Sequence, residues 1–237
     1  MRKTLVSLGL LLIFFLCGGL RAEDKKEREM LENIHWLGQD GFKLNLGKTA
    51  VYLDPYKIKE GSEKADFIFI THEHRDHFSP EDISRIVKKE TVLVSCKAVT
   101  GLYEGNKQEI KAGETFKTEL FSVSAVPAYN INKKFHPKES GKLGYIIEYK
   151  GLRIYHAGDT DIIPEMKEFK CNIALLPVSG TYVMTAEEAV EAAKILKPDF
   201  AIPMHYGAGV VGTVEDAKKF KEGLKAAGTE VVIKEKE

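Results

Sequence analysis

Three of the seven histidines in this 237-residue chain fall within six positions, in the stretch His72-Glu73-His74-Arg75-Asp76-His77. Imidazole and carboxylate are the ligands that zinc and similar borderline ions prefer. In a tight loop, donors two residues apart can converge on one ion, and donors four and five residues along can reach a second. The alternative is a solvated histidine-rich loop without a metal. A His-x-His-x-Asp-His spacing is a far more demanding pattern than a lone histidine, so it disfavours that alternative. The stretch therefore predicts a metal site.

The residues on either side place this stretch in a turn. Residues 66–70 read as a buried strand, with Phe-Ile-Phe-Ile following the acid. Ser79-Pro80-Glu81-Asp82 has the features of a helix start: a capping serine, proline at the first helical position and acids in the first turn. A stretch this polar cannot continue the sheet, so we expect it at the end of the strand.

Short strands and helices alternate along the rest of the chain. Strands are expected at 34–37, 42–46, 50–53, 91–95, 108–111, 115–118, 120–126, 145–149, 153–156, 173–176, 199–203 and 230–233. Further helices are expected from the capping box Thr185-Ala186-Glu187-Glu188 to about residue 196, and from Thr213 to about residue 226. Two β-rich blocks, each with helices for one sheet face, predict an α+β protein with a four-layer α/β/β/α sandwich. A doubly wound sheet fits less well, because the middle section has hairpins where that fold needs helical crossovers.

Taken together, these motifs resemble the metallo-β-lactamase-fold superfamily of metal-dependent hydrolases. The His-x-His-x-Asp-His stretch looks like its metal-binding motif, Gly158-Asp159-Thr160 resembles its bridging aspartate, and Pro203-Met204-His205-Tyr206 resembles its late strand-end histidine. The opening residues 34–42 and Leu53-Asp54-Pro55 are similar to the branch that contains the L-ascorbate-6-phosphate lactonases. The resemblance covers residues 34–237.

The resemblance implies a role for each of these side chains. It implies that the first metal is held by His72 and His74, the second by Asp76, His77 and His205, and that Asp159 bridges the two. The first site needs a third ligand from the middle section. Asn130 is nearer the expected position, but we choose His136 because imidazole binds these ions better than an amide does.

Other polar residues near these motifs have two interpretations each. Asp54, at a strand end, either accepts a proton from a ligating imidazole or is an ordinary turn aspartate before Pro55. We expect His35 and His156 to be structural rather than ligating.

The function expected is that of a metal-dependent hydrolase acting on a small molecule. A metal-bound hydroxide, oriented by Asp76, would attack an ester, lactone or phosphoester. The leaving group would take its proton from metal-bound water, Tyr206 or His136. We expect one or two zinc ions, with manganese and iron as alternatives.

Other functions on the same fold stay open. One is a metal-binding or sensing protein without catalysis, and another is a phosphodiesterase or nuclease. A diiron redox protein is a third, disfavoured because His74 stands where an oxygen-reducing member more usually has an acid.

The amino-terminal residues have the order of a signal peptide. Arg2 and Lys3 precede an apolar run over residues 5–16, which is shorter than the roughly 20 residues needed to span a bilayer. We expect a signal peptide over residues 1–22, a charged leader over 23–33 and a metallo-hydrolase domain over 34–237. The protein would then be exported to the periplasm or the extracellular space; an uncleaved membrane anchor is the alternative.

The net charge of the chain indicates which kinds of partner it can bind. The whole chain has a formal net charge of zero, and without residues 1–22 it has 32 basic and 35 acidic residues. Nucleic-acid binders need a basic surface to neutralise phosphates, so we expect no nucleic-acid partner. The oligomeric state is not readable from the sequence.

Overall fold

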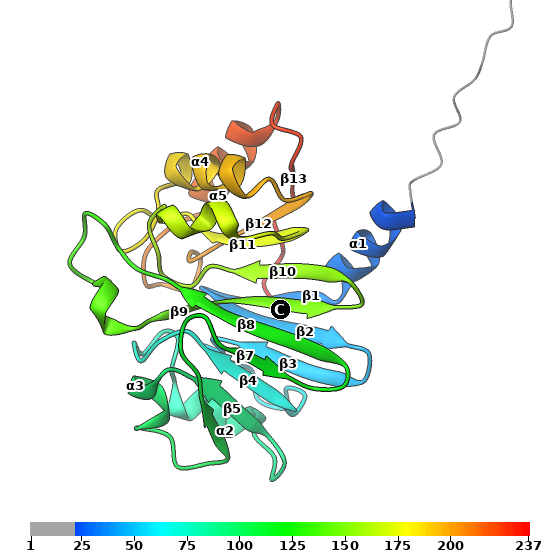
Figure 1. Ribbon diagram of the computed structural model, residues 1–237, viewed down its shortest axis with the longest axis vertical. Helices are drawn as coiled ribbons and strands as arrows, with labels where there is room; N and C mark the ends of the chain where they lie inside the picture. Colours follow the sequence, from blue (N-terminus) through cyan, green and yellow to red (C-terminus); the bar gives the residue numbers. More distant parts are fainter. Residues whose placement is uncertain (1–21) are drawn as a thin grey trace, which may run out of the picture.

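In the computed structural model, which describes residues 22–237, two β-sheets pack face to face (Figure 1). The first sheet has the order β1 (Ile34–Gly38), β2 (Gly41–Leu46), β3 (Thr49–Leu53), β4 (Phe67–Ile70), β5 (Val92–Ser95) and β6 (Lys107–Glu109). The second has the order β13 (Glu230–Val231), β12 (Phe200–Met204), β11 (Ile173–Pro177), β10 (Leu152–His156), β9 (Leu143–Tyr149), β8 (Phe121–Pro127) and β7 (Thr115–Lys117).

Helices cover the outer sides of both sheets. Beside the first sheet lie α2 (Pro80–Ile86) and α3 (Lys97–Thr100), and beside the second lie α4 (Ala186–Leu196) and α5 (Val214–Leu224) (Figure 1). Two 3₁₀ turns, Lys138–Ser140 and Pro164–Glu168, lie in the connections after β8 and β10. The predicted α/β/β/α sandwich is confirmed.

Most expected elements lie within one or two residues of their predicted positions, and the differences have local causes. The last strand is shorter than predicted, because only Glu230 and Val231 pair with β12. The segment expected as a charged leader forms helix α1 (Ala22–Glu32). This helix contacts β1, and Met30 and Leu31 are buried in the core.

Aromatic side chains join the two sheets. The ring of Phe69 in β4 lies edge-on to Phe116 in β7 and to Tyr145 in β9, with centroids 5.7 and 5.5 Å apart. Such pairs contribute about 0.5–1.5 kcal/mol each beyond the area they bury. The Tyr145 hydroxyl also donates to the Ile70 carbonyl at 2.6 Å. The end of β4 is therefore held against the second sheet.

Strand direction brings the polar turns together. The strands β3, β4 and β5 run parallel to one another, as do β10, β11 and β12. The carboxyl ends of parallel strands lie at one edge of a sheet, which is where open α/β sheets bind ligands. Because the two sheets stack, the turns after β3, β4, β10 and β12 meet at that edge.

The expected signal peptide lies almost entirely outside the described residues and stays a prediction. Within residues 22–237, no helix combines the length and apolar character that a membrane crossing requires.

The capping box before α4 gives a test of the fold. The Thr185 hydroxyl accepts from the Glu188 amide at 3.1 Å, and the Glu188 carboxylate accepts from the Thr185 amide at 2.8 Å. Thr185→Ala should lower the free energy of unfolding by about 1 kcal/mol in urea denaturation. Thr181→Ala, at an exposed position four residues earlier, is the control and should change it little. Equal effects of the two variants would contradict this role.

Candidate metal centre

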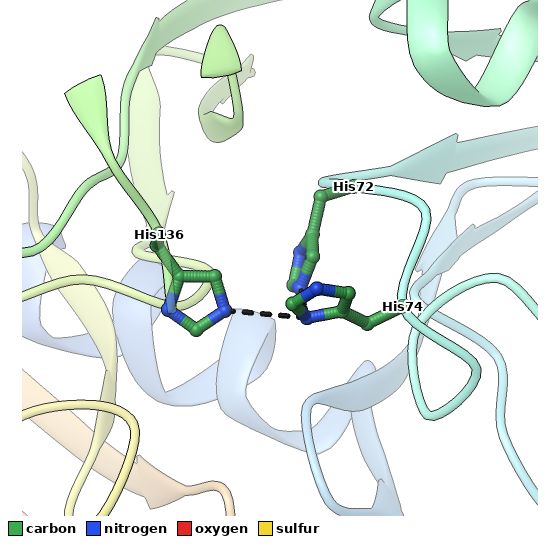
Figure 2. A group of neighbouring side chains, drawn as sticks. All are labelled: His72, His74 and His136. Atoms are coloured by element: carbon green, nitrogen blue, oxygen red, sulfur yellow. Dashed lines mark hydrogen bonds between the residues drawn. The ribbon is translucent and has the colours of Figure 1, made fainter. Parts of the chain in front are cut away.

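The turn after β4 and the connection between β8 and β9 bring three imidazoles together (Figure 2). His74 Nδ1 lies 3.1 Å from His72 Nε2 and 3.4 Å from His136 Nε2. His72 and His136 are buried, and His74 is more exposed than either. Three nitrogens converging at this distance form a first donor group, suited to one cation.

Neighbouring side chains orient two of these rings. The Asn130 carbonyl oxygen lies 3.1 Å from His136 Nδ1 and also accepts from the His136 amide. The Thr71 hydroxyl lies 2.9 Å from His72 Nδ1. Both Nε2 atoms are thereby turned towards the group, as is usual for histidines that bind metals. Asn130 is therefore not a member of the donor group but the residue that holds its third member, His136.

A second donor group lies beside the first and is completely buried. It consists of Asp40, His77, Asp159 and His205. The Nε2 atoms of His77 and His205 each lie 3.4 Å from Asp159 Oδ1. These residues come from the β1–β2 turn and from the turns after β4, β10 and β12, so four separate chain segments supply one donor each.

Hydrogen bonds also orient the second group. His77 Nδ1 lies 2.8 Å from Asp54 Oδ2, and His205 Nδ1 lies 2.7 Å from the Ser179 hydroxyl. Asp54 in turn accepts from the amide and the hydroxyl of Thr71, at 2.7 and 2.6 Å. Asp54 is thus both a turn residue and the partner of an imidazole in the donor group.

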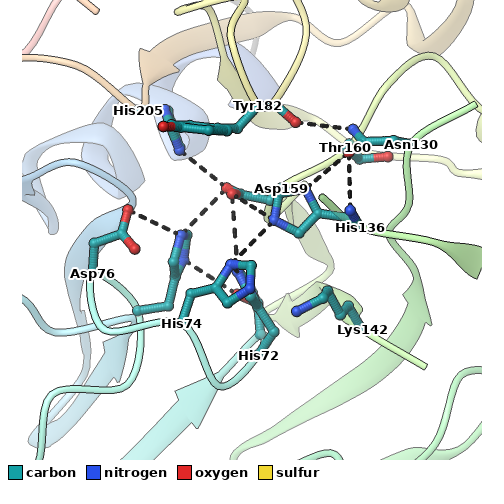
Figure 3. Close-up of polar contacts among 12 residues, drawn as sticks. His72, His74, Asp76, Asn130, His136, Lys142, Asp159, Thr160, Tyr182 and His205 are labelled. Carbon is teal, nitrogen blue, oxygen red and sulfur yellow. Dashed lines mark hydrogen bonds and ion pairs between the residues drawn. The ribbon is translucent and has the colours of Figure 1, made fainter. Parts of the chain in front are cut away.

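Asp159 lies between the two groups (Figure 3). Its Oδ2 is 3.2 Å from His136 Nε2 and 3.9 Å from His72 Nε2, whereas its Oδ1 faces His77 and His205. One carboxylate oxygen thus faces each group, which is the arrangement a bridging ligand needs.

The second group contains buried polar atoms that lack a hydrogen-bond partner in the described part of the chain. Both oxygens of Asp40, Oδ1 of Asp159 and the Nε2 atoms of His77 and His205 are buried without a hydrogen-bond partner among residues 22–237. An unsatisfied buried polar group costs about 1–3 kcal/mol, and more if it is charged. A cation held here would take one ligand atom from each of the four residues, so these residues fit a metal ion.

The pKa values in the second donor group are shifted because its ionisable side chains are buried close together. Burial lowers the pKa of His205, but the carboxylates of Asp159 and Asp40 outweigh it and raise that pKa to about 9. The pKa of His77 is likewise raised against burial, by Asp159 and Asp54. Burial raises the pKa of Asp159 too, but the two imidazoles hold it well below its usual range. Without a metal, protons on these imidazoles take the place of its positive charge.

Left-handed backbone occurs at one donor, His205, and immediately before another, Asp159. His205 has φ of 63°, in the left-handed region that non-glycine residues rarely adopt. Gly158, immediately before Asp159, has φ of 61°, and a Cβ atom there would lie 2.7 Å from the Leu143 carbonyl oxygen. The backbone at Asp159 therefore needs glycine before it.

Asp76, expected both as a ligand and as the residue that orients the hydroxide, lies at the side of the second group. Its Oδ2 is 3.6 Å from His77 Nε2 and accepts from Gln39 Nε2 at 3.0 Å. Its side chain is 20% exposed, whereas the Asp40 side chain is fully buried. Asp40 is the acid that lies grouped with the other three donors, and the predicted ligand role of Asp76 stays a prediction.

Tyr206, also expected to be catalytic, follows His205 directly. Its ring stacks on Trp36, with centroids 4.6 Å apart, and its hydroxyl is buried without a partner in residues 22–237. Burial raises its pKa to about 12. His35 lies apart from both groups and contacts Asn45 and Glu237. The ring of His156 lies 2.8 Å from the Asp40 carbonyl oxygen, so it supports a donor residue.

Asp40 is the donor that sequence reasoning missed. It sits in Gly38-Gln39-Asp40-Gly41, a pattern typical of an exposed hairpin turn. The turn is buried instead, because the Gln39 amide donates to the Tyr206 carbonyl and the Gln39 carbonyl accepts from the His205 amide. The large apolar residues on both sides, Trp36 and Phe42, were the only local sign of burial.

Metal binding should depend on pH. Because the pKa values of His77 and His205 are raised, both imidazoles are protonated near neutrality and a cation must displace those protons. The apparent metal affinity should therefore rise with pH up to about 9. Calorimetry in buffers of different ionisation enthalpy should detect released protons, fewer of them in His205→Ala. His35→Ala is the control and should match the wild type; a pH-independent affinity would contradict the argument.

Asp54 should control metal affinity without contacting the metal. Asp54→Ala removes the partner of His77 Nδ1 and should weaken metal binding about 10–100-fold in competition with a chromophoric chelator. Asp82→Ala removes another buried acid, which accepts from the Ile58 amide at 2.8 Å. That control should lower stability but leave metal affinity unchanged. Equal metal affinities in the two variants would refute the orienting role.

Comparison with known proteins agrees with this geometry. Residues 33–205 match the family model of the β-lactamase superfamily domain. A UPF0173 metal-dependent hydrolase of Thermoplasma acidophilum is 35% identical over 86% of this chain and 97% of its own length. One from Archaeoglobus fulgidus is 30% identical over 84% and 94%. The crystal structure of a proposed metal-dependent hydrolase from Parabacteroides distasonis superposes with a TM-score of 0.76 at 34% identity, covering 86% of this chain and 93% of that one.

A more distant structure shares the fold alone. Igni18, a metallo hydrolase from Ignicoccus hospitalis, has a TM-score of 0.71 at 24% identity, over 85% of this chain and 94% of its own. The two donor groups, the sandwich and the curated relatives lead to one assignment: the chain belongs to the UPF0173 family of metal-dependent hydrolases, in the metallo-β-lactamase superfamily.

Proposed function

We propose that the protein hydrolyses an ester, lactone or phosphoester bond of a small molecule with two cations, one in each donor group. The observation that carries this proposal is the position of Asp159, with one oxygen towards each group. The names of the curated relatives give metal dependence and hydrolysis but no substrate.

Zinc is the cation we propose. Three imidazoles would hold one ion, and two imidazoles with the carboxylates of Asp40 and Asp159 would hold the other. Nitrogen and oxygen donors without thiolate suit Zn²⁺, and the same set also accepts Mn²⁺ or iron. When bound, such ions lower the pKa of a coordinated water to about 7 and stabilise negative charge on the reacting group.

The chain's own residues would supply proton transfer and orientation. Asp76 is beside the donors yet partly exposed, and Gln39 holds its carboxylate, so we assign it to accept a proton from the attacking water. His136 has Nδ1 engaged with Asn130 and Nε2 turned towards Asp159, which leaves it poorly placed to donate a proton. Tyr206 is protonated at neutral pH, as an ordinary tyrosine is, and burial raises its pKa further to about 12. It stays the predicted acid for the leaving group.

The proposed substrate class follows the resemblance to the lactonase branch only in part. The branch that contains the L-ascorbate-6-phosphate lactonases favours a lactone, an ester or a phosphorylated small molecule over a β-lactam, but we do not carry over the sugar phosphate itself. A nuclease is disfavoured by the acidic balance of residues 23–237.

Asp76→Asn should separate catalysis from folding. If Asp76 accepts the proton, the variant should lose about 10²–10⁴-fold in kcat with little change in Tm. Asp66→Asn is the control at the opposite end of β4, where the carboxylate accepts from the Ala50 amide at 2.8 Å. It should lower Tm and keep kcat.

The assay is a screen of p-nitrophenyl esters, γ- and δ-lactones and bis-(p-nitrophenyl) phosphate with zinc-loaded protein. Full activity of Asp76→Asn would refute its role. Bound metal without turnover of any compound would favour a metal-binding or sensing protein.

A further inference from the structure

The loop that supplies His136 exposes large apolar side chains beside the metal centre. Ile131 is 53% exposed and Phe135, the residue immediately before His136, is 47% exposed. Single exposed apolar residues are common on protein surfaces, but a group of them beside a reactive centre is a candidate binding surface.

A second aromatic residue from a distant segment joins this loop. The rings of Phe135 and Tyr182 pack edge to face, with centroids 4.6 Å apart at 88°. Tyr182 lies in the connection between β11 and α4. In Figure 3 its side chain is drawn between Asn130 and His205. The pair thus adjoins the loop that supplies His136 and contacts Asn130, the residue that orients His136.

Hydrogen bonds hold this aromatic pair in place. Asn130, which orients His136, donates to the Tyr182 carbonyl at 2.9 Å and to Asp161 at 3.1 Å. Asp161 also accepts from the Ile131 amide at 2.9 Å. The same side chain therefore fixes a metal donor and both segments of the apolar surface, so little ordering cost remains when a ligand binds there.

Three of the four lysines in the connection between β8 and β9 are already paired with acids. Lys133 pairs with Asp161, Lys138 with Glu165 at 2.8 Å, and Lys142 with Glu73 at 3.0 Å. A phosphate group would have to compete with these carboxylates for each of the three paired ammonium groups. An uncharged apolar group has no such competitor at the aromatic pair.

We propose that Phe135 and Tyr182 form an apolar wall that binds an alkyl or aryl group of the substrate next to the bond that is cleaved. The wall selects carboxylic esters or lactones with an apolar acyl part over compact phosphoesters. This inference rests on the proposed function, because it assigns the substrate class of the same centre.

Binding of two product-like carboxylates tests the wall without turnover. Zinc-loaded protein is titrated calorimetrically with acetate and with hexanoate, which carry the same charge and differ in apolar length. The wild type should bind hexanoate at least about tenfold more tightly, because an apolar pocket gains affinity with each methylene it buries. Phe135→Ala and Tyr182→Ala should lose most of that preference while keeping their metal content.

Two further variants test whether the preference belongs to this pair of rings. Leu120→Ala removes an apolar side chain that is 44% exposed in the β7–β8 turn, and it should keep the wild-type preference. Tyr182→Phe keeps the ring and should also keep the preference; its loss would assign the effect to the hydroxyl and overturn the wall.

The outcomes distinguish this inference from the proposed function. Equal binding of acetate and hexanoate by the wild type overturns the wall, whether or not esters are hydrolysed. A preserved hexanoate preference without turnover of any ester or lactone supports the wall and counts against the hydrolytic reaction. A dimer in size-exclusion chromatography that Phe135→Ala converts to a monomer would show that a second copy covers this surface, and would also overturn the proposal.

Discussion

The structure depends on one buried carboxylate between two sets of imidazoles. Asp159 is only 3% exposed, and each of its oxygens faces a different group of donors. Burying ionisable groups this closely is costly unless opposite charge and hydrogen bonds compensate. In the metal-free chain, protons on His77 and His205 provide part of that compensation, and the unsatisfied donor atoms show that it is incomplete. The cations that we propose would complete it.

The sandwich brings these groups together at the ends of rigid elements. Aromatic contacts between Phe69, Phe116 and Tyr145 hold the sheets in one relative position, and the parallel strands of both sheets end at the same edge. Each donor then needs only a short turn to reach the centre. Strain at His205 and the glycine before Asp159 show where the turns are held in conformations that an unconstrained chain would avoid.

The candidate metal donors and the proposed apolar wall belong to different parts of this fold. The donors sit on strand ends and in tight turns, whereas the proposed apolar wall comes from two longer connections, β8–β9 and β11–α4. Such connections vary more than the elements they join, so one metal centre can serve many substrates. Here Asn130 joins the two parts, because it orients His136 and also binds the Tyr182 carbonyl. A change in the β11–α4 connection can therefore alter the position of His136 through the side chain of Asn130.

Local spacing alone determined the histidine-rich turn, the strand that precedes it, the capping box at Thr185 and the alternation of elements that predicts the sandwich. These features depend on residues close together in the chain, whose backbone geometry permits few arrangements. The resemblance added Asp159 and His205, and the structure places both beside the turn.

Three features were decided only by the tertiary structure. It placed His136 rather than Asn130 in the first donor group, put Asp40 in the second, and set Phe135 against Tyr182. Each depends on contacts between segments far apart in the chain. Asp40 in particular is a donor only because the packing of Gln39 on the backbone at His205 and Tyr206 buries a turn that would otherwise face water. Burial of a polar turn is a property of the whole fold, and short-range sequence pattern carries no measure of it.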